Sequence, residues 1–193
     1  MGQRHLEMDA EPSIDRAARR LEAESTATIA RAVYDHAGEL AVLEYGQPAA
    51  MLGAIRLAAR RTGVGEPDRE RLAAEFDVDP DRVVAADELQ SRYLTPPADD
   101  DEIRRLRRRL IVAREVLAAV ERGRGAGPEL PGSHLADAAP FLLARASSHL
   151  DSRTDREFPG LDAAALRDHV ERLEADLEFA RLGTKLYRLV HEE

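Results

Sequence analysis

Residues 99–120, DDDEIRRLRRRLIVAREVLAAV, determine the fold class of this chain. Their apolar side chains recur in alternating steps of three and four residues, at Ile103, Leu106, Leu110, Ala113, Leu117 and Val120. That spacing places them on one face of an α-helix, and the acids at its start suit the helix dipole. The same rhythm returns near the end of the chain, at Leu166, Val170, Leu173, Leu177 and Ala180. Two such stripes pack most simply on each other or on a second copy of the chain.

The first half of the chain has helical patterns as well, separated by glycine and proline signals. A helix is predicted to start near Ser13, to be interrupted or recapped at 25–26, and to run on until Gly46-Gln47-Pro48. Its apolar residues are Ile14, Ala17, Ala18, Leu21, Ile29, Val33, Ala37, Leu40 and Ala41. A helix over 49–61 is apolar around more than half of its surface, which predicts the buried centre of the domain. Two short helices, 68–76 and 81–94, are predicted to follow.

A boundary between two helical parts is predicted where prolines are followed by acids. Thr95-Pro96-Pro97 ends the first part and the acidic run at 99–102 opens the second. We therefore predict an all-α protein with a domain over 13–97 and a helical hairpin or bundle over 99–193. Within the second part, a shorter helix is expected over about 137–150, between two linkers.

Composition excludes several classes of function. The 193 residues include no cysteine, which rules out disulfides, thiolate catalysis and cysteine-ligated metals. No two histidines stand four residues apart, and no phosphate-binding, dinucleotide-binding or nucleophile motif is present. We expect no enzyme activity, no metal and no cofactor. The net charge of −9 argues against non-specific nucleic-acid binding by the chain as a whole.

The expected location is the cytoplasm, with no contact with a membrane. No apolar run approaches the roughly 20 residues that span a bilayer. The first eleven residues carry charges of both signs and no apolar stretch, unlike a secretory signal.

Residues 68–94 have the pattern of a helix-turn-helix. Leu72, Ala73 and Phe76 are predicted to point inward from the first helix, and Val78 to fill the turn. Val83 and Leu89 are predicted to hold the second helix against the core.

Together with the two helices before it, this pattern resembles one cyclin-like repeat of the archaeal and eukaryotic transcription factor B family. The segments that carry the resemblance are PAAMLGAIRLAARRTG, residues 48–63, and RLAAEFDV, residues 71–78. It covers residues 26–94 and implies a role in transcription. The chain departs from the family because it lacks the cysteine zinc ribbon and a recognisable second repeat. Its helix at 81–94 also mixes acids with bases, which opposes phosphate contacts.

The candidate nucleic-acid-binding residues lie mainly in a cluster with five arginines in six positions, 104–109. Arg104, Arg105, Arg108 and Arg109 are the candidate phosphate ligands, with Arg82 and Arg92 as secondary candidates. The alternative is a solvated face paired with the acids at 99–102 and with acids of the last helix, Glu171, Glu174 and Glu178.

Two hypotheses for the function remain open at this point. The first is a non-enzymatic transcription-associated adaptor or regulator that binds protein and possibly DNA. The second is a structural interaction protein that touches no nucleic acid and holds a partner, or a second copy, through its apolar stripes. A continuous positive patch that joins 104–109 to the helix at 81–94 favours the first. Dispersed charge with an exposed leucine or valine stripe favours the second.

Overall fold

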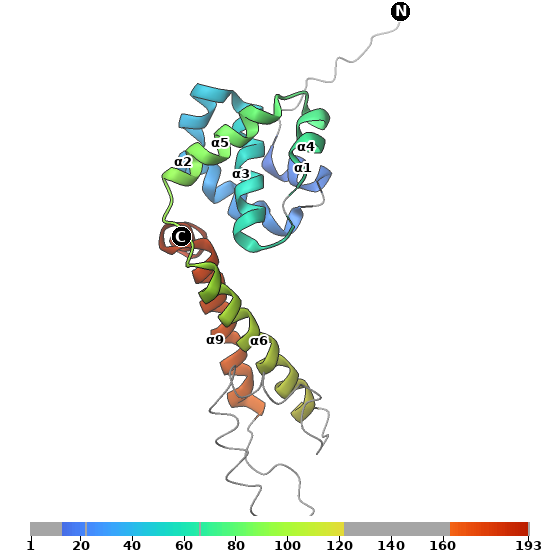
Figure 1. The fold of residues 1–193 in the computed structure, drawn as a ribbon, viewed down its shortest axis with the longest axis vertical. Coiled ribbons are helices and arrows are strands. Elements are labelled where there is room, and N and C mark those ends of the chain that lie inside the picture. Colours follow the sequence, from blue (N-terminus) through green and yellow to red (C-terminus); the bar gives the residue numbers. More distant parts are fainter. Residues whose placement is uncertain (1–12, 22, 66, 122–162, 193) are drawn as a thin grey trace, which may run out of the picture. The chain divides into compact units, whose positions relative to one another are not determined.

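The computed structural model describes residues 13–192 apart from 22, 66 and 122–162. All regular structure in the described residues is helical, which confirms the predicted all-α class for this part of the chain. The chain divides into two compact units, drawn in Figure 1. The first unit runs up to Pro97 and includes the residues from Arg181 onward, and the second runs from Ala98 to Ala180. The helix predicted over 137–150 lies outside the described residues.

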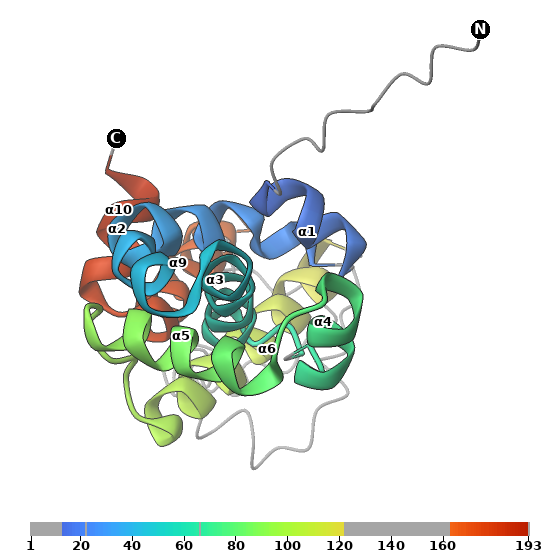
Figure 2. The same cartoon turned by 90° about the horizontal axis from the view of Figure 1, so that it is seen from above.

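The first unit is a bundle of short helices packed around α3. The described elements are α1 (Ile14–Arg20), a 3₁₀ turn η1 (Glu24–Thr26), α2 (Ala27–Tyr45), α3 (Gln47–Thr62), α4 (Arg69–Phe76), α5 (Pro80–Arg92) and α10 (Thr184–His191). Helix α3 packs against α1, α2 and α5, and Figure 2 shows it among them. Its side chains at Met51, Leu52, Ile55 and Leu57 are almost completely buried, as predicted for this segment.

Local signals set most of the helix ends. The Ser13 hydroxyl accepts a hydrogen bond from the Arg16 amide at 3.3 Å, so α1 begins where the sequence predicts. Helices α2 and α3 end at Gly46 and Gly63, both with positive φ. The Asp79 carboxylate accepts a hydrogen bond from the Asp81 amide at the start of α5. Within the described residues, the helices expected from the sequence are therefore present, with ends within a few residues of their predicted positions.

A buried carboxylate joins α5 to α3. The Asp87 side chain is 1% exposed. Both of its oxygens accept hydrogen bonds from the Arg60 guanidinium, at 2.9 and 2.8 Å, and Arg56 Nε lies 3.4 Å from Oδ2. The two helices meet closely because of Gly53, where an added Cβ would lie 2.8 Å from the Asp87 backbone nitrogen. This contact fixes α5 along α3, because a buried carboxylate that slid away from its arginines would be strongly destabilising.

Helix α10 completes the first unit. Leu182 and Leu186 are buried in the same apolar cluster as Ile55 and Val33. The chain reaches this position through Gly183, whose positive φ separates α9 from α10. The sequence places 181–193 in the second domain, but in the structure this segment packs in the first unit. The cause is packing between residues far apart in the sequence, since Leu186 is buried in the apolar cluster of the first unit.

Two arginines tie this returning segment to the end of α3. Arg61 is buried and donates to the carbonyls of Thr95 and Leu182, at 3.2 Å each. Arg181 donates to the Thr62 carbonyl at 2.8 Å. Burial is the largest cause that lowers the pKa of the Arg61 guanidinium. The last carbonyl of α3, that of Thr62, thus accepts a hydrogen bond from a positive charge, which suits a helix C-terminus, and Arg61 holds the Thr95 carbonyl before the second unit.

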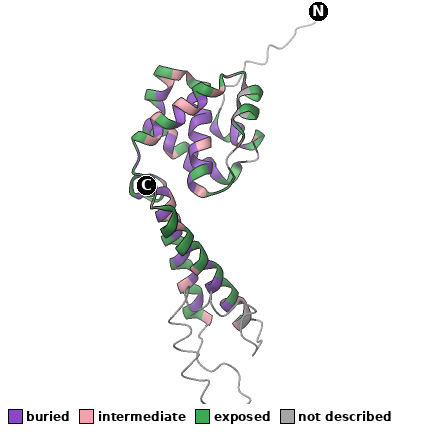
Figure 3. Cartoon of the chain, in the orientation of Figure 1, coloured by how far each residue is buried: buried purple, intermediate pink, exposed green. Residues whose placement is uncertain are grey.

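The second unit is built on two paired helices, α6 (Asp100–Glu121) and α9 (Ala163–Leu182), of which the last two residues of α9 belong to the first unit. The predicted apolar stripes pack on each other, and Figure 3 shows buried residues along both helices. The buried cluster consists of Leu106, Leu110, Ala113, Val170, Leu173, Leu177 and Ala180. Two ion pairs, Arg114–Glu174 and Arg167–Glu121, join the helices at 2.6 Å each. No helix in the described ranges combines the length and the apolarity that crossing a bilayer requires.

The Asp87→Ala substitution should destabilise the first unit by about 3 kcal/mol, because it leaves the Arg56 and Arg60 charges without their carboxylate. Native-state hydrogen exchange of the α3 and α5 amides measures this opening free energy. The matched control is Glu88→Ala, the next residue along α5, which is exposed and should change the free energy by less than about 0.5 kcal/mol. Equal effects of the two substitutions would contradict the role of Asp87.

The Gly183→Ala substitution should destabilise the docking of α10. Its φ is +74°, and a Cβ would lie 2.6 Å from the Thr95 oxygen and 2.7 Å from the Pro96 oxygen. We expect a cost of more than about 2 kcal/mol, measured as a loss of hydrogen-exchange protection in α10. Two alanine controls separate the effect of the positive φ from the effect of the close Cβ contacts. Gly46→Ala has positive φ but open space, so it should cost less, and Gly65→Ala has open space without positive φ, so it should be nearly neutral.

Candidate interaction surface

Three arginines and an isoleucine form one exposed face of α6. Arg104, Arg107, Arg108 and Ile111 are all exposed, and we call them the arginine face. At about 100° per residue, their spacing places them side by side on the helix surface away from the apolar stripe. Ile111 is 47% exposed, although it is a large apolar residue.

The other two members of the arginine cluster lie elsewhere on the helix. Arg105 is exposed but points about 100° around the helix from Arg104, so it lies at the margin of the face. Arg109 is half-buried, and its charge acts on His169 of α9. Of the four candidate phosphate ligands on α6, the structure therefore brings together Arg104 and Arg108. Arg107, which was not among the predicted phosphate ligands, lies on the same face. The sequence feature that could have identified this face is Ile111, because this apolar residue does not fit the three- and four-residue spacing of the apolar stripe.

The charges of the arginine face are only partly neutralised. Arg104 pairs with Asp101 at 2.6 Å within α6, and both side chains are exposed. Among the described residues, no ion pair joins Arg107 or Arg108 to a carboxylate. Glu174 of α9 instead pairs with Arg114. Pairing with the acids, the alternative interpretation of the cluster, is therefore observed for Arg104 and not for its two neighbours.

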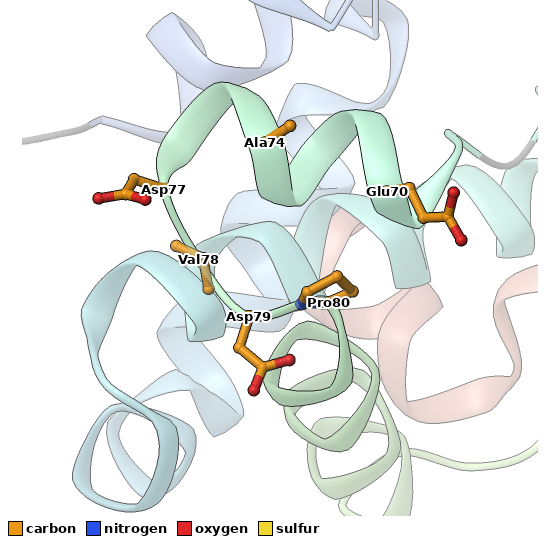
Figure 4. A pocket seen from close by; sticks show the side chains of 6 residues that line it. All are labelled: Glu70, Ala74, Asp77, Val78, Asp79 and Pro80. Atoms are coloured by element: carbon orange, nitrogen blue, oxygen red, sulfur yellow. The ribbon is translucent and has the colours of Figure 1, made fainter.

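The arginines of α5 lie among acids. Arg82 and Arg92 are both exposed, but Asp81 stands next to the first and Glu88 lies one turn before the second. A shallow hollow of about 390 Å³ lies between α4 and the start of α5. It is lined by Glu70, Ala74, Asp77, Val78, Asp79 and Pro80, and Figure 4 shows its three carboxylates. Such a surface opposes the approach of phosphates.

Helix α2 exposes two leucines near its C-terminal end. Leu40 is 43% exposed and Leu43 is 79% exposed, although the spacing in the sequence placed Leu40 on the packed face. Glu39 and Glu44 are also exposed. We call these four residues the leucine face. Tyr45 donates a hydrogen bond to Glu44 Oε1 at 3.0 Å, and this bond is the largest cause that raises the pKa of the tyrosine.

The histidine beside Arg109 is not placed for metal binding. His169 on α9 has a lowered pKa, because of partial burial and then the charges of Arg109 and Arg172, against which Asp176 acts. Within the described ranges, no group of three histidine or acidic side chains could hold a metal ion. The altered pKa is thus a consequence of how α6 and α9 pack.

Comparison with known proteins gives no guide to these surfaces. No protein-family model, no curated protein and no solved structure matches the chain. A function must therefore be inferred from the two faces and their chemistry.

The pairing of α6 with α9 should weaken as the pH falls through the ordinary pKa of histidine, near 6.5. His169 binds its proton more weakly in the folded unit than in the unfolded chain, so stability is full above this pH and declines below it. An NMR titration of the His169 ring should give a pKa below the usual value. The Arg109→Gln substitution should raise it, because it removes a neighbouring positive charge. A titration unaffected by this substitution would contradict the assignment.

Proposed function

We propose that this chain is a non-enzymatic helical adaptor that binds a protein partner through the arginine face of α6. The observation that carries the proposal is the exposed Ile111, which lies on the same face as the three arginines, one turn beyond Arg107 and Arg108. Phosphates are bound by positive charge and hydrogen bonds and gain little from an apolar side chain. A partner protein gains from both, since interfaces combine an apolar centre with a polar rim and are enriched in arginine.

The chemistry of the face specifies the kind of partner. Arg107 and Arg108 each present a planar guanidinium suited to carboxylates. Burying the remaining surface of Ile111 would contribute on the order of 1 kcal/mol, and the aliphatic stems of the arginines add to it. The partner that fits is an acidic amphipathic helix, with leucines on one stripe and glutamates or aspartates beside them.

A role in transcription is part of this proposal and rests on the resemblance of residues 26–94 to a cyclin-like repeat. The succession of helices from α2 to α5 is compatible with that resemblance. DNA binding receives less support than protein binding, because acids line the hollow between α4 and α5 and flank Arg82 and Arg92. The net charge of −9 acts in the same direction.

Fluorescence anisotropy across a salt series tests the proposal with two labelled probes. One is a helical peptide of Glu, Ala and Leu whose leucines recur every three or four residues, and the other is a mixed-sequence DNA duplex. We expect the peptide to bind the full chain at low salt, and Arg107→Glu/Arg108→Glu to weaken binding by about tenfold or more. Ile111→Ser should weaken it several-fold at every salt concentration.

The control variant is Arg16→Glu/Arg172→Glu, which makes the same change in charge at exposed positions on α1 and α9. It should leave peptide binding nearly unchanged. Failure of the peptide to bind at low salt would refute the proposal. Tighter binding of DNA, with a salt slope that the Arg107/Arg108 variant reduces, would favour the nucleic-acid function instead.

A further inference from the structure

We infer that the partner of the arginine face is the leucine face of a second copy of this chain, so that the protein self-associates head to tail. The inference rests on the proposed function, since it takes the arginine face to be a protein-binding surface. The acidic amphipathic helix that the arginine face binds is then α2 of the second copy.

The leucine face has the layout that such a partner needs. Leu43 and Leu40 form an apolar stripe on α2 and are 79% and 43% exposed. At about 100° per residue, Glu39 lies on the Leu43 side of this stripe and Glu44 on the Leu40 side. The hydrogen bond from Tyr45 holds the Glu44 carboxylate in place. The result is an apolar stripe with a negative charge along each margin.

The arginine face has the same layout with the opposite charge. Around the helix axis, Arg104 and Arg108 lie on one side of Ile111, and Arg107 lies on the other. When the two helices pack lengthwise, Ile111 can lie against Leu40 and Leu43 while the arginines meet the glutamates. The chain thus carries both halves of one interface, and this charge complementarity is what favours a second copy over an unrelated partner.

The geometry also predicts the form and strength of the assembly. Because the two faces differ, the contact is heterologous, and each dimer leaves one face of each kind open for another copy. A single helix-to-helix contact is smaller than the roughly 1,200 Å² of a stable interface, and its ion pairs are exposed and screened by salt. The association should therefore be weak, should grow with protein concentration and should be suppressed by salt.

Sedimentation velocity of the full chain, over a concentration series and at low and high salt, tests this inference by charge swapping. Glu39→Arg/Glu44→Arg makes both faces positive, and Arg107→Glu/Arg108→Glu makes both negative. Each variant should lower the association constant by about tenfold or more. Combining all four substitutions in one chain restores opposite charges and should restore association. Mixing the two double variants should restore it as well.

Recovery of association in the combined variant distinguishes a direct contact from damage to the fold. If each pair of substitutions damaged the fold, combining them would lower the association constant further instead of restoring it. Glu24→Arg/Glu171→Arg is the control for net charge at exposed positions on η1 and α9, and it should not lower the association. A wild-type chain that sediments as a monomer at every concentration would overturn the inference. Peptide binding to the arginine face would then still support the adaptor function. Association that persists in both double variants would also overturn it, because the interface would lie elsewhere.

Discussion

The buried carboxylate of Asp87 constrains the first unit more strongly than any single apolar contact. Apolar side chains can exchange neighbours at modest cost, but a buried charge without its counterion is strongly destabilising. Only one position of α5 along α3 gives Asp87 both Arg60 and Arg56. Gly53 permits this position by letting the two backbones approach. The apolar core therefore stabilises the unit, and the ion cluster selects its arrangement.

The path of the chain beyond α5 depends on this arrangement. The end of α5 determines where Thr95 lies, and the Thr95 carbonyl is one of the two that Arg61 binds. The other belongs to Leu182, where the chain returns from the second unit. One arginine at the end of α3 thus holds both the departing and the returning segment of the chain. The internal order of the first unit and the place where the second unit is attached are consequences of the same two helices.

The sequence predicts the features that depend on near neighbours along the chain. Ser13, Gly46 and Gly63 mark helix ends because capping involves only a few residues. The pairing of α6 with α9 could be predicted for the same reason, since each stripe is visible within its own helix. An aspartate among mixed charges looks like a surface residue, so nothing in the local sequence marks Asp87 as buried.

The candidate site was predicted in part. The arginine cluster was found, but residues adjacent in sequence diverge around a helix, and only part of the cluster shares a face. Periodicity also placed Leu40 in the core, because helical spacing indicates a common face without showing where the packing partner ends. The assignment of 181–193 to the first unit depends on contacts between residues far apart in the sequence. Local sequence patterns therefore predict neither the exposure of Leu40 nor the placement of 181–193.

The return of the chain at Arg181 makes the second unit an insertion within the first. During synthesis, α1 to α5 leave the ribosome before the inserted residues, and α10 leaves after them. The apolar surface that Leu182 and Leu186 cover therefore stays open while the whole second unit is being made. A nascent or truncated chain that ends after Pro97 carries this surface uncovered. The first unit can therefore complete its folding only after α10 has been synthesised and has docked.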